Sequence, residues 1–219
     1  MWSANILALL LVAWQIKVAG VGGVADNLTL IEYGARKPNA GFPQAPWRLV
    51  ASMFLHGGWF HVVANVFLLS LWGTQWARLV KAPGLIATFL IAGIWGNLIS
   101  DIYGPEALAV GASGGTSGLV LAVLCLAALG PDRVGWHGEQ RQWLRVSAAV
   151  VVLNLAMAFG LTSVAGGRLD HWAHVGGAVA GAVLGCFASR GDRWFWGASC
   201  GLAAAAAAVV WYRGPSPFG

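Results

Sequence analysis

Residues 171–189 read HWAHVGGAVAGAVLGCFAS, a run of 19 positions that contains no Asp, Glu, Lys or Arg. A helix needs roughly 17 to 25 apolar residues to cross a bilayer, so this run is long enough for one crossing. Gly177, Gly181 and Gly185 follow His174 by three, seven and eleven positions and therefore share its helix face. The run predicts a membrane helix with a face of small residues for close contact with another helix.

The composition of the whole chain indicates the same class of protein. Of its 219 residues, 58% are hydrophobic and 10% are charged, whereas soluble domains carry about 25% charged residues. The 31 glycines permit close helix packing, and the 13 tryptophans are typical of residues at the headgroup level. The formal net charge is +5, but the basic residues stand singly between apolar runs and form no patch for a nucleic acid. We therefore interpret them as signals of membrane topology.

The apolar stretches predict seven membrane spans, near residues 4–24, 49–77, 83–102, 112–130, 143–161, 171–189 and 194–212. The second stretch is too long for one crossing and contains a polar string from His56 to His61, which predicts an irregular entry before a regular helix from Trp59 to Arg78. We therefore expect an all-α polytopic membrane protein. Residues 1–189 would form its membrane core, and residues 190–219 a cytoplasmic loop, an additional C-terminal transmembrane helix and a short tail.

Basic residues mark alternate loops, namely those after the second, fourth and sixth spans: Arg78 and Lys81; Arg133, Arg141 and Arg145; Arg190 and Arg193. Loops rich in Lys and Arg stay on the cytoplasmic side, which predicts a cytoplasmic N-terminus. Arg36, Lys37 and Arg48 in the first outer loop argue mildly against this orientation. The compact loops, without an organelle-type presequence, lead us to expect a bacterial inner membrane.

Polar side chains at membrane depth are costly, so each one is a candidate functional residue. His61 and Asn65 are four positions apart on the second span and share a helix face. By themselves they are explained as well by hydrogen bonds between membrane helices. Ser113, in the run Val110 to Gly118, is flanked by glycines that expose its hydroxyl and nearby N–H groups, as a nucleophile requires. Helix packing by Gly114 and Gly118 would explain the same run.

His174 is the candidate base for this hydroxyl. If the glycines below it pack on the fourth span, the two residues lie at a similar depth near the outer ends of their helices. Asp170 precedes His174 by four positions and suggests a Ser-His-Asp triad. An aspartate at a helix start is more often an N-cap, so we predict that role for it. His171 is expected at the membrane interface.

Three stretches together resemble the rhomboid family of intramembrane serine proteases. WRLVASMFLHGGWFHVVAN (47–65) resembles the second-span signature of that family, GASG (111–114) the nucleophile motif, and AHVGG (173–177) the base motif. The resemblance covers about residues 33 to 187, in the family's order. It implies a six-helix bundle core, to which the predicted seventh span is an addition.

The resemblance also implies roles for these residues. Ser113 would attack the scissile carbonyl and His174 would transfer the proton. His61, Asn65 and the N–H of Ser113 would form the oxyanion hole. His56, Gly111, Trp47 and Arg48 would support the site, with His56 holding the outer loop. Ser117, in a second G-x-S-G one turn after Ser113, is an alternative nucleophile. Substrates would be transmembrane segments of single-span proteins, cleaved in or near the outer side of the bilayer without cofactor or metal.

Two other functions are compatible with part of the pattern. A catalytically inactive rhomboid-like protein would bind membrane clients, but such proteins usually lose the Ser-His pair, which this chain retains at Ser113 and His174. A transporter could use the histidines as metal ligands. Zinc needs three or four converging ligands, commonly with carboxylate or thiolate help, and Asp170 is the only acidic residue on those helix faces. The protease is therefore the leading hypothesis.

Overall fold

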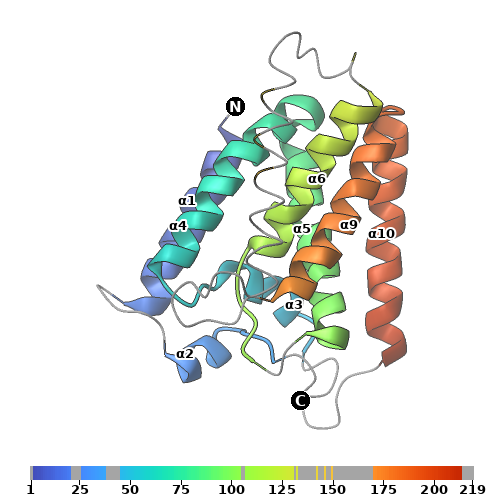
Figure 1. Cartoon of the computed structure of the whole chain (residues 1–219). Helices are drawn as coiled ribbons and strands as arrows, with labels where there is room; N and C mark the ends of the chain where they lie inside the picture. Colours follow the sequence, from blue (N-terminus) through green and yellow to red (C-terminus); the bar gives the residue numbers. More distant parts are fainter. Residues whose placement is uncertain are drawn as a thin grey trace.

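The chain folds into a bundle of helices (Figure 1). A computed structural model describes residues 2–20, 26–37, 45–104, 107–130 and 170–213, with the single positions 132, 142, 146 and 149. Every regular element within the continuous ranges is helical: α1 (Ser3–Ala19), α2 (Asn27–Glu32), α3 (Arg48–Ala51), the 3-10 turn η1 (Ser52–Phe54), α4 (Trp59–Leu68), the π-helical turn η2 (Leu69–Gly73), α5 (Thr74–Tyr103), α6 (Ser113–Leu129), α9 (His171–Ala188) and α10 (Asp192–Arg213).

Three of the described helical runs are long and apolar enough to cross a membrane: Trp59–Tyr103, His171–Ala188 and Asp192–Tyr212. The first contains 45 residues and bends at Lys81, whose φ of 63° breaks the helix two positions before Pro83. It therefore holds the predicted second and third spans. Two shorter apolar helices, α1 and α6, correspond to the first and fourth spans. The protein is an all-α polytopic membrane protein, as predicted.

Some predicted boundaries need correction or remain predictions. The first span was expected to reach residue 24, but α1 ends at Ala19 because Gly20 adopts a positive φ of 66°. The irregular entry to the second span is confirmed, since α3 and η1 precede a helix that begins at Trp59. The expected regular helix from Trp59 to Arg78 is, however, interrupted by the π-helical turn η2. The fifth predicted span, 143–161, lies outside the described residues apart from two single positions. The division at residue 189 stays a prediction.

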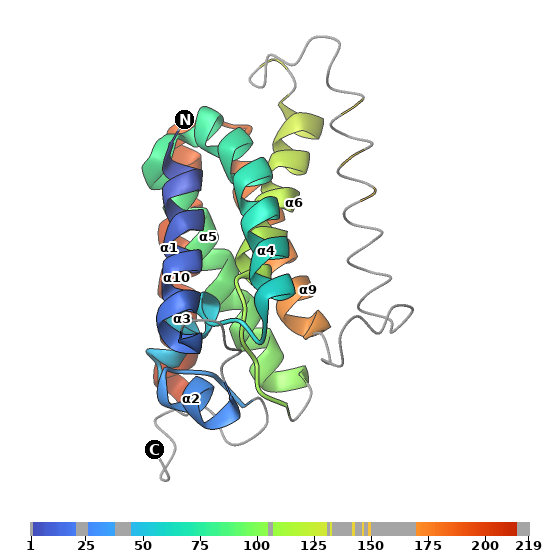
Figure 2. The same ribbon diagram turned by 90° about the vertical axis from the view of Figure 1, so that its left-hand side faces the viewer.

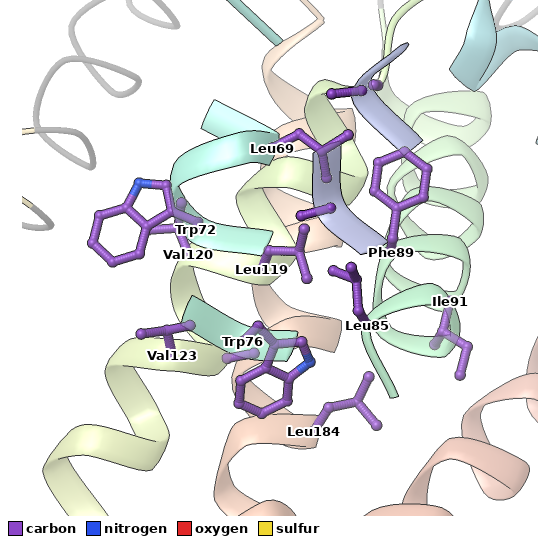
Figure 3. Packing of buried hydrophobic residues seen from close by; sticks show 14 of the residues in the cluster. Leu69, Trp72, Trp76, Leu85, Phe89, Ile91, Leu119, Val120, Val123 and Leu184 are labelled. Atoms are coloured by element: carbon purple, nitrogen blue, oxygen red, sulfur yellow. The ribbon is translucent and has the colours of Figure 1, made fainter. Parts of the chain in front are cut away.

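A buried cluster fills the space between η2, α5, α6 and α9 (Figure 3). Trp72, Trp76 and Phe89 are its largest side chains, and all three are fully buried. Because lipid tails are as apolar as these side chains, dense packing rather than removal from water stabilises such a cluster. The indole N–H of Trp76 donates to Thr88 Oγ1 at 2.8 Å, which pairs a polar group inside the apolar core.

Helices α6 and α9 run side by side in the same direction, with backbone against backbone (Figures 1 and 2). A Cβ placed on Gly177 would lie 2.0 Å from the carbonyl oxygen of Gly114, and one on Gly181 would lie 2.0 Å from that of Gly118. Gly185 meets Ala122 in the same way, at 2.3 Å. The face of small residues predicted on the sixth span therefore packs on the fourth, and the two helices begin at the same end of the bundle.

Polar contacts fasten the loop before α3 to the end of α5. Arg36 is buried, forms an ion pair with Asp101 and donates to the carbonyl oxygen of Asn97 at 2.7 Å. The amide nitrogen of Asn97 donates in turn to the carbonyl oxygen of Leu49 at 2.7 Å and to Ser52 Oγ at 3.1 Å. These contacts fix the end of the bundle at which α6 and α9 begin.

Helix α10 lies on the outside of this bundle (Figure 1). It packs on α9 and α5, and the indole N–H of Trp95 donates to the carbonyl oxygen of Leu202 at 3.1 Å. Most of its side chains are exposed, as expected for a membrane helix with one lipid-facing side.

Candidate active site

Ser113 is the first residue of α6, and the chain reaches it through a turn at Gly111. Gly111 has a φ of 128°, in the region that favours glycine, and its N–H donates to the carbonyl oxygen of Ser52 at 2.9 Å. A Cβ on Gly111 would lie 2.7 Å from Cε1 and 2.8 Å from Nε2 of His61, and 3.8 Å from Ser113 Oγ. The imidazole of His61 therefore occupies the place that a side chain at position 111 would need, beside the hydroxyl of Ser113.

His61 and Asn65 lie one turn apart on α4, as their spacing predicts. The amide nitrogen of Asn65 donates to the carbonyl oxygen of His61 at 3.0 Å. The ring of His56 lies edge-on to the ring of His61, with 5.0 Å between their centroids. His56 is fully buried, and neither of its ring nitrogens has a hydrogen-bond partner among the described residues. The site thus has one buried histidine packed against a second that borders Ser113.

Thr116 on α6 contacts α4, and it was not identified as a candidate residue from the sequence. Its side chain is buried, and its hydroxyl lies 3.1 Å from the carbonyl oxygen of Ser113 and 3.5 Å from Oδ1 of Asn65. The available signal was its position three residues after Ser113, which places a hydrogen-bonding side chain near the same face of α6. The amide of Asn65 therefore has a polar neighbour at each end, one on α4 and one on α6.

His174 lies in the first turn of α9 and is buried, with 9% of its surface exposed. Gly177, three positions later, meets Gly114, so His174 and Ser113 occupy the first turns of parallel helices at the same end of the bundle. Nδ1 of His174 is buried and has no hydrogen-bond partner within the described ranges. The hydrogen bond from Ser113 to His174 stays a prediction.

Asp170 is an N-cap, as predicted. Its Oδ1 accepts from the N–H of Ala173 at 3.1 Å, and its Oδ2 accepts from the hydroxyl of Ser100 on α5. Each carboxylate oxygen thus receives a donor other than His174. These contacts show that Asp170 fixes the start of α9. The sequence favoured this N-cap role over a role as the third member of a catalytic triad.

The remaining candidates surround this centre. Ser117 lies one turn after Ser113 on α6 and is half-buried like it, so both stay candidates for the nucleophile. The ring of His171 packs against Trp172, with 5.5 Å between their centroids.

The pair Trp47 and Arg48 fastens the chain segment around residues 31–35 to the start of α3. Arg48 donates to the carbonyl oxygens of Ile31 at 2.6 Å and Ala35 at 2.8 Å, and its guanidinium lies 4.8 Å from the centre of the Trp47 ring. The indole in turn packs on Gly34, where an added Cβ would lie 2.4 Å from the ring. These contacts agree with a supporting role away from the reacting groups.

The arrangement brings a hydroxyl, imidazoles and an amide to one end of the bundle. A serine hydroxyl beside a base and hydrogen-bond donors is suited to nucleophilic acyl transfer. In the described part of the chain, no three His, Cys, Asp or Glu side chains gather in a way that could hold a metal ion.

Comparison with known proteins gives consistent matches. A family model for the rhomboid domain matches residues 43–191. The chain is similar to rhomboid-type serine protease 2 of Emericella nidulans, with 31% identity over 149 residues that cover 68% of this chain and 28% of the relative. It is also similar to rhomboid-like protease 1 of Toxoplasma gondii, with 32% identity over 160 residues that cover 71% and 52% of the two chains.

A bacterial relative extends the comparison. Rhomboid protease GluP of Bacillus subtilis is 27% identical over 164 residues, covering 73% of this chain and 29% of the relative. The chain thus spans about half or less of the length of these three relatives. The match to the domain model nevertheless covers both α6 and α9 with all the site residues described above. The chain belongs to the rhomboid family.

Proposed function

We propose that the protein is an intramembrane serine endopeptidase that cleaves transmembrane segments of single-span membrane proteins in or near the outer side of the bilayer. The observation that carries this proposal is the parallel contact of α6 and α9, in which the first turns of the two helices hold Ser113 and His174. The relatives named as proteases support the same class of reaction.

In the proposed reaction, Ser113 Oγ attacks the carbonyl carbon of the scissile peptide bond while His174 accepts the hydroxyl proton. The carbonyl oxygen becomes an oxyanion, which His61, Asn65 and the N–H of Ser113 stabilise by hydrogen bonds. The C–N bond then breaks as His174 returns the proton to the leaving amine, and an acyl-enzyme remains. Water, deprotonated by His174, hydrolyses this ester and restores the serine.

The contacts of His174 support a dyad rather than a triad. In a triad a carboxylate accepts from Nδ1 of the histidine and orients it. Here that nitrogen has no partner among the described residues, and Asp170 is occupied by Ala173 and Ser100. Burial between α9 and its neighbours would orient the imidazole instead.

The proposed substrates follow from the environment of the site. A helix in lipid has all its backbone groups paired, so a peptide bond becomes accessible only where the helix unwinds. We expect cleavage near small or helix-breaking residues. The cytoplasmic N-terminus, and a bacterial inner membrane inferred from the compact loops, remain part of this proposal.

The purified protein in proteoliposomes tests this function with a single-span membrane protein as substrate. We expect two fragments whose junction, mapped by mass spectrometry, lies in the outer half of the transmembrane segment. His174→Ala should abolish the cut, and His171→Ala, a change in the same helical turn, should retain it. A folded wild-type protein that neither cleaves nor reacts with a fluorophosphonate would instead support the inactive, client-binding alternative.

The turn at Gly111 gives a further prediction for this activity. Gly111→Ala forces a Cβ against the ring of His61 and strains a φ of 128°, so we expect kcat to fall about 100-fold through displacement of the reacting groups. Initial rates of cleavage measure the effect. Gly57→Ala is the control, because a Cβ at Gly57 has no atom within 4 Å. Equal rates for both variants would show that the close approach of the Gly111 backbone to His61 is not needed for cleavage.

A further inference from the structure

We propose that Thr116 is a positioning residue, which fixes the side-chain amide of Asn65 so that its nitrogen faces the oxyanion. The inference rests on the proposed function, since it concerns the same site. No motif of the chain singles out Thr116, and its assignment comes from contacts between α6 and α4.

Two contacts define the geometry around the amide. At one end, the nitrogen of Asn65 donates to the carbonyl oxygen of His61 at 3.0 Å. At the other end, Oδ1 of Asn65 lies 3.5 Å from the hydroxyl of Thr116. Both side chains are almost wholly buried, Asn65 with 3% and Thr116 with 1% of its surface exposed. Few other hydrogen-bonding groups can therefore reach the amide, and its orientation depends on these two neighbours.

An amide can occupy its site in two orientations related by a half turn. In the observed one, the nitrogen keeps a second N–H beyond the bond to His61, and this N–H is free for a developing negative charge. In the reversed one, Oδ1 would face the carbonyl oxygen of His61, which places two acceptors against each other. A hydroxyl that donates to Oδ1 favours the observed orientation and strengthens the N–H groups as donors through polarisation of the amide.

The hydroxyl of Thr116 has one proton and two acceptors within reach. The carbonyl oxygen of Ser113 is the nearer, at 3.1 Å. Threonines within helices often make such a bond to their own backbone without any functional role. The distance to Asn65 is long for a hydrogen bond, as is common for catalytic contacts that tighten only when the transition state forms. A hydroxyl that only bonds its own backbone and a hydroxyl that orients Asn65 predict different effects on the kinetics of cleavage.

Thr116→Val removes the hydroxyl and keeps the shape of the side chain. If Thr116 orients Asn65, kcat falls about tenfold, the effect of losing one hydrogen bond of ordinary strength, and KM is unchanged because the oxyanion exists only in the transition state. Thr116→Ser restores the hydroxyl and should restore most of kcat. Thr88→Val is the matched control, since Thr88 is a buried threonine whose hydroxyl pairs with Trp76 away from the site.

A double-mutant comparison separates positioning from a general loss of stability. In an Asn65→Ala background the amide is absent, so Thr116→Val should change kcat by less than about twofold. If Thr116→Val lowers kcat equally in both backgrounds, or leaves it at the wild-type value, the inference is overturned while the proposed function stands. If a folded wild-type protein cleaves no transmembrane substrate, both the role of Thr116 and the proposed protease function are overturned. A parallel test for fluorophosphonate labelling of Ser113, which should then fail, identifies that outcome.

Discussion

Alanine at position 113 is expected to lower kcat for substrate cleavage at least about 1000-fold, because the reaction loses its nucleophile and no acyl-enzyme can form. The fold should persist, since Ser113 is half-buried and the helix contacts of this turn are made by Gly114. Cleavage rates in proteoliposomes and the melting temperature of the same preparation measure the two effects.

The control for this prediction is Ser117→Ala. Ser117 lies one turn further along α6, equally half-buried, so the two variants remove the same group at different depths. We expect Ser117→Ala to retain cleavage and fluorophosphonate labelling. Activity that survives Ser113→Ala and is lost in Ser117→Ala would assign the nucleophile to Ser117.

Leucine in place of Gly181 is expected to prevent stable folding of the bundle. Even a Cβ at this position would lie 2.0 Å from the carbonyl oxygen of Gly118, and the atom it meets belongs to backbone that cannot turn aside. Overpacking of a tight contact costs about 1–3 kcal/mol, and a whole leucine side chain between two touching backbones should cost more than that range. Size-exclusion chromatography and thermal unfolding in detergent measure the loss of folded protein.

Gly201→Leu provides the comparison on the outer helix. A Cβ at Gly201 has no atom within 4 Å, and the residue is exposed on α10, where leucine suits both a helix and a lipid-facing surface. This variant should unfold at or above the wild-type temperature. If Gly181→Leu were as stable as Gly201→Leu, close contact between α6 and α9 would not hold the bundle together.

Hydrophobic pattern was sufficient to predict most of the helices. The start of α4 at Trp59 followed from a polar string before an apolar run, and glycines at helical spacing predicted the face of α9 that makes a close helix contact, with α6 assumed as the partner. The end of α1 was placed too late, because the small residues after Gly20 are apolar and do not by themselves mark a helix end. The hydrophobic pattern of a sequence indicates which residues avoid water. It does not indicate where a glycine changes the direction of the backbone.

The contacts between distant residues could not be predicted in this way. Arg36 was taken as a basic residue in an outer loop, but it is buried against Asp101, 65 positions away. Thr116 lies in the glycine-rich run from Val110 to Gly118, and because helix packing was enough to explain that run, the threonine was not considered separately. Each contact depends on how two distant segments pack in space, a loop against α5 for Arg36 and α6 against α4 for Thr116, which the local sequence of neither segment contains. The sequence indicated candidate residues for the site and some of their supports, such as Asp170, whereas the contacts of Arg36 and Thr116 were found only in the structure.

The contact between α6 and α9 also sets an order of events during synthesis. His174 leaves the ribosome 61 residues after Ser113, which corresponds to several seconds at about 5–20 residues per second. During that interval the nascent chain has a serine but neither the proposed base nor the glycine face on which α6 packs. Proteolytic competence would then arise only with the insertion of α9, so an unfinished chain could not cut the other nascent membrane proteins around it.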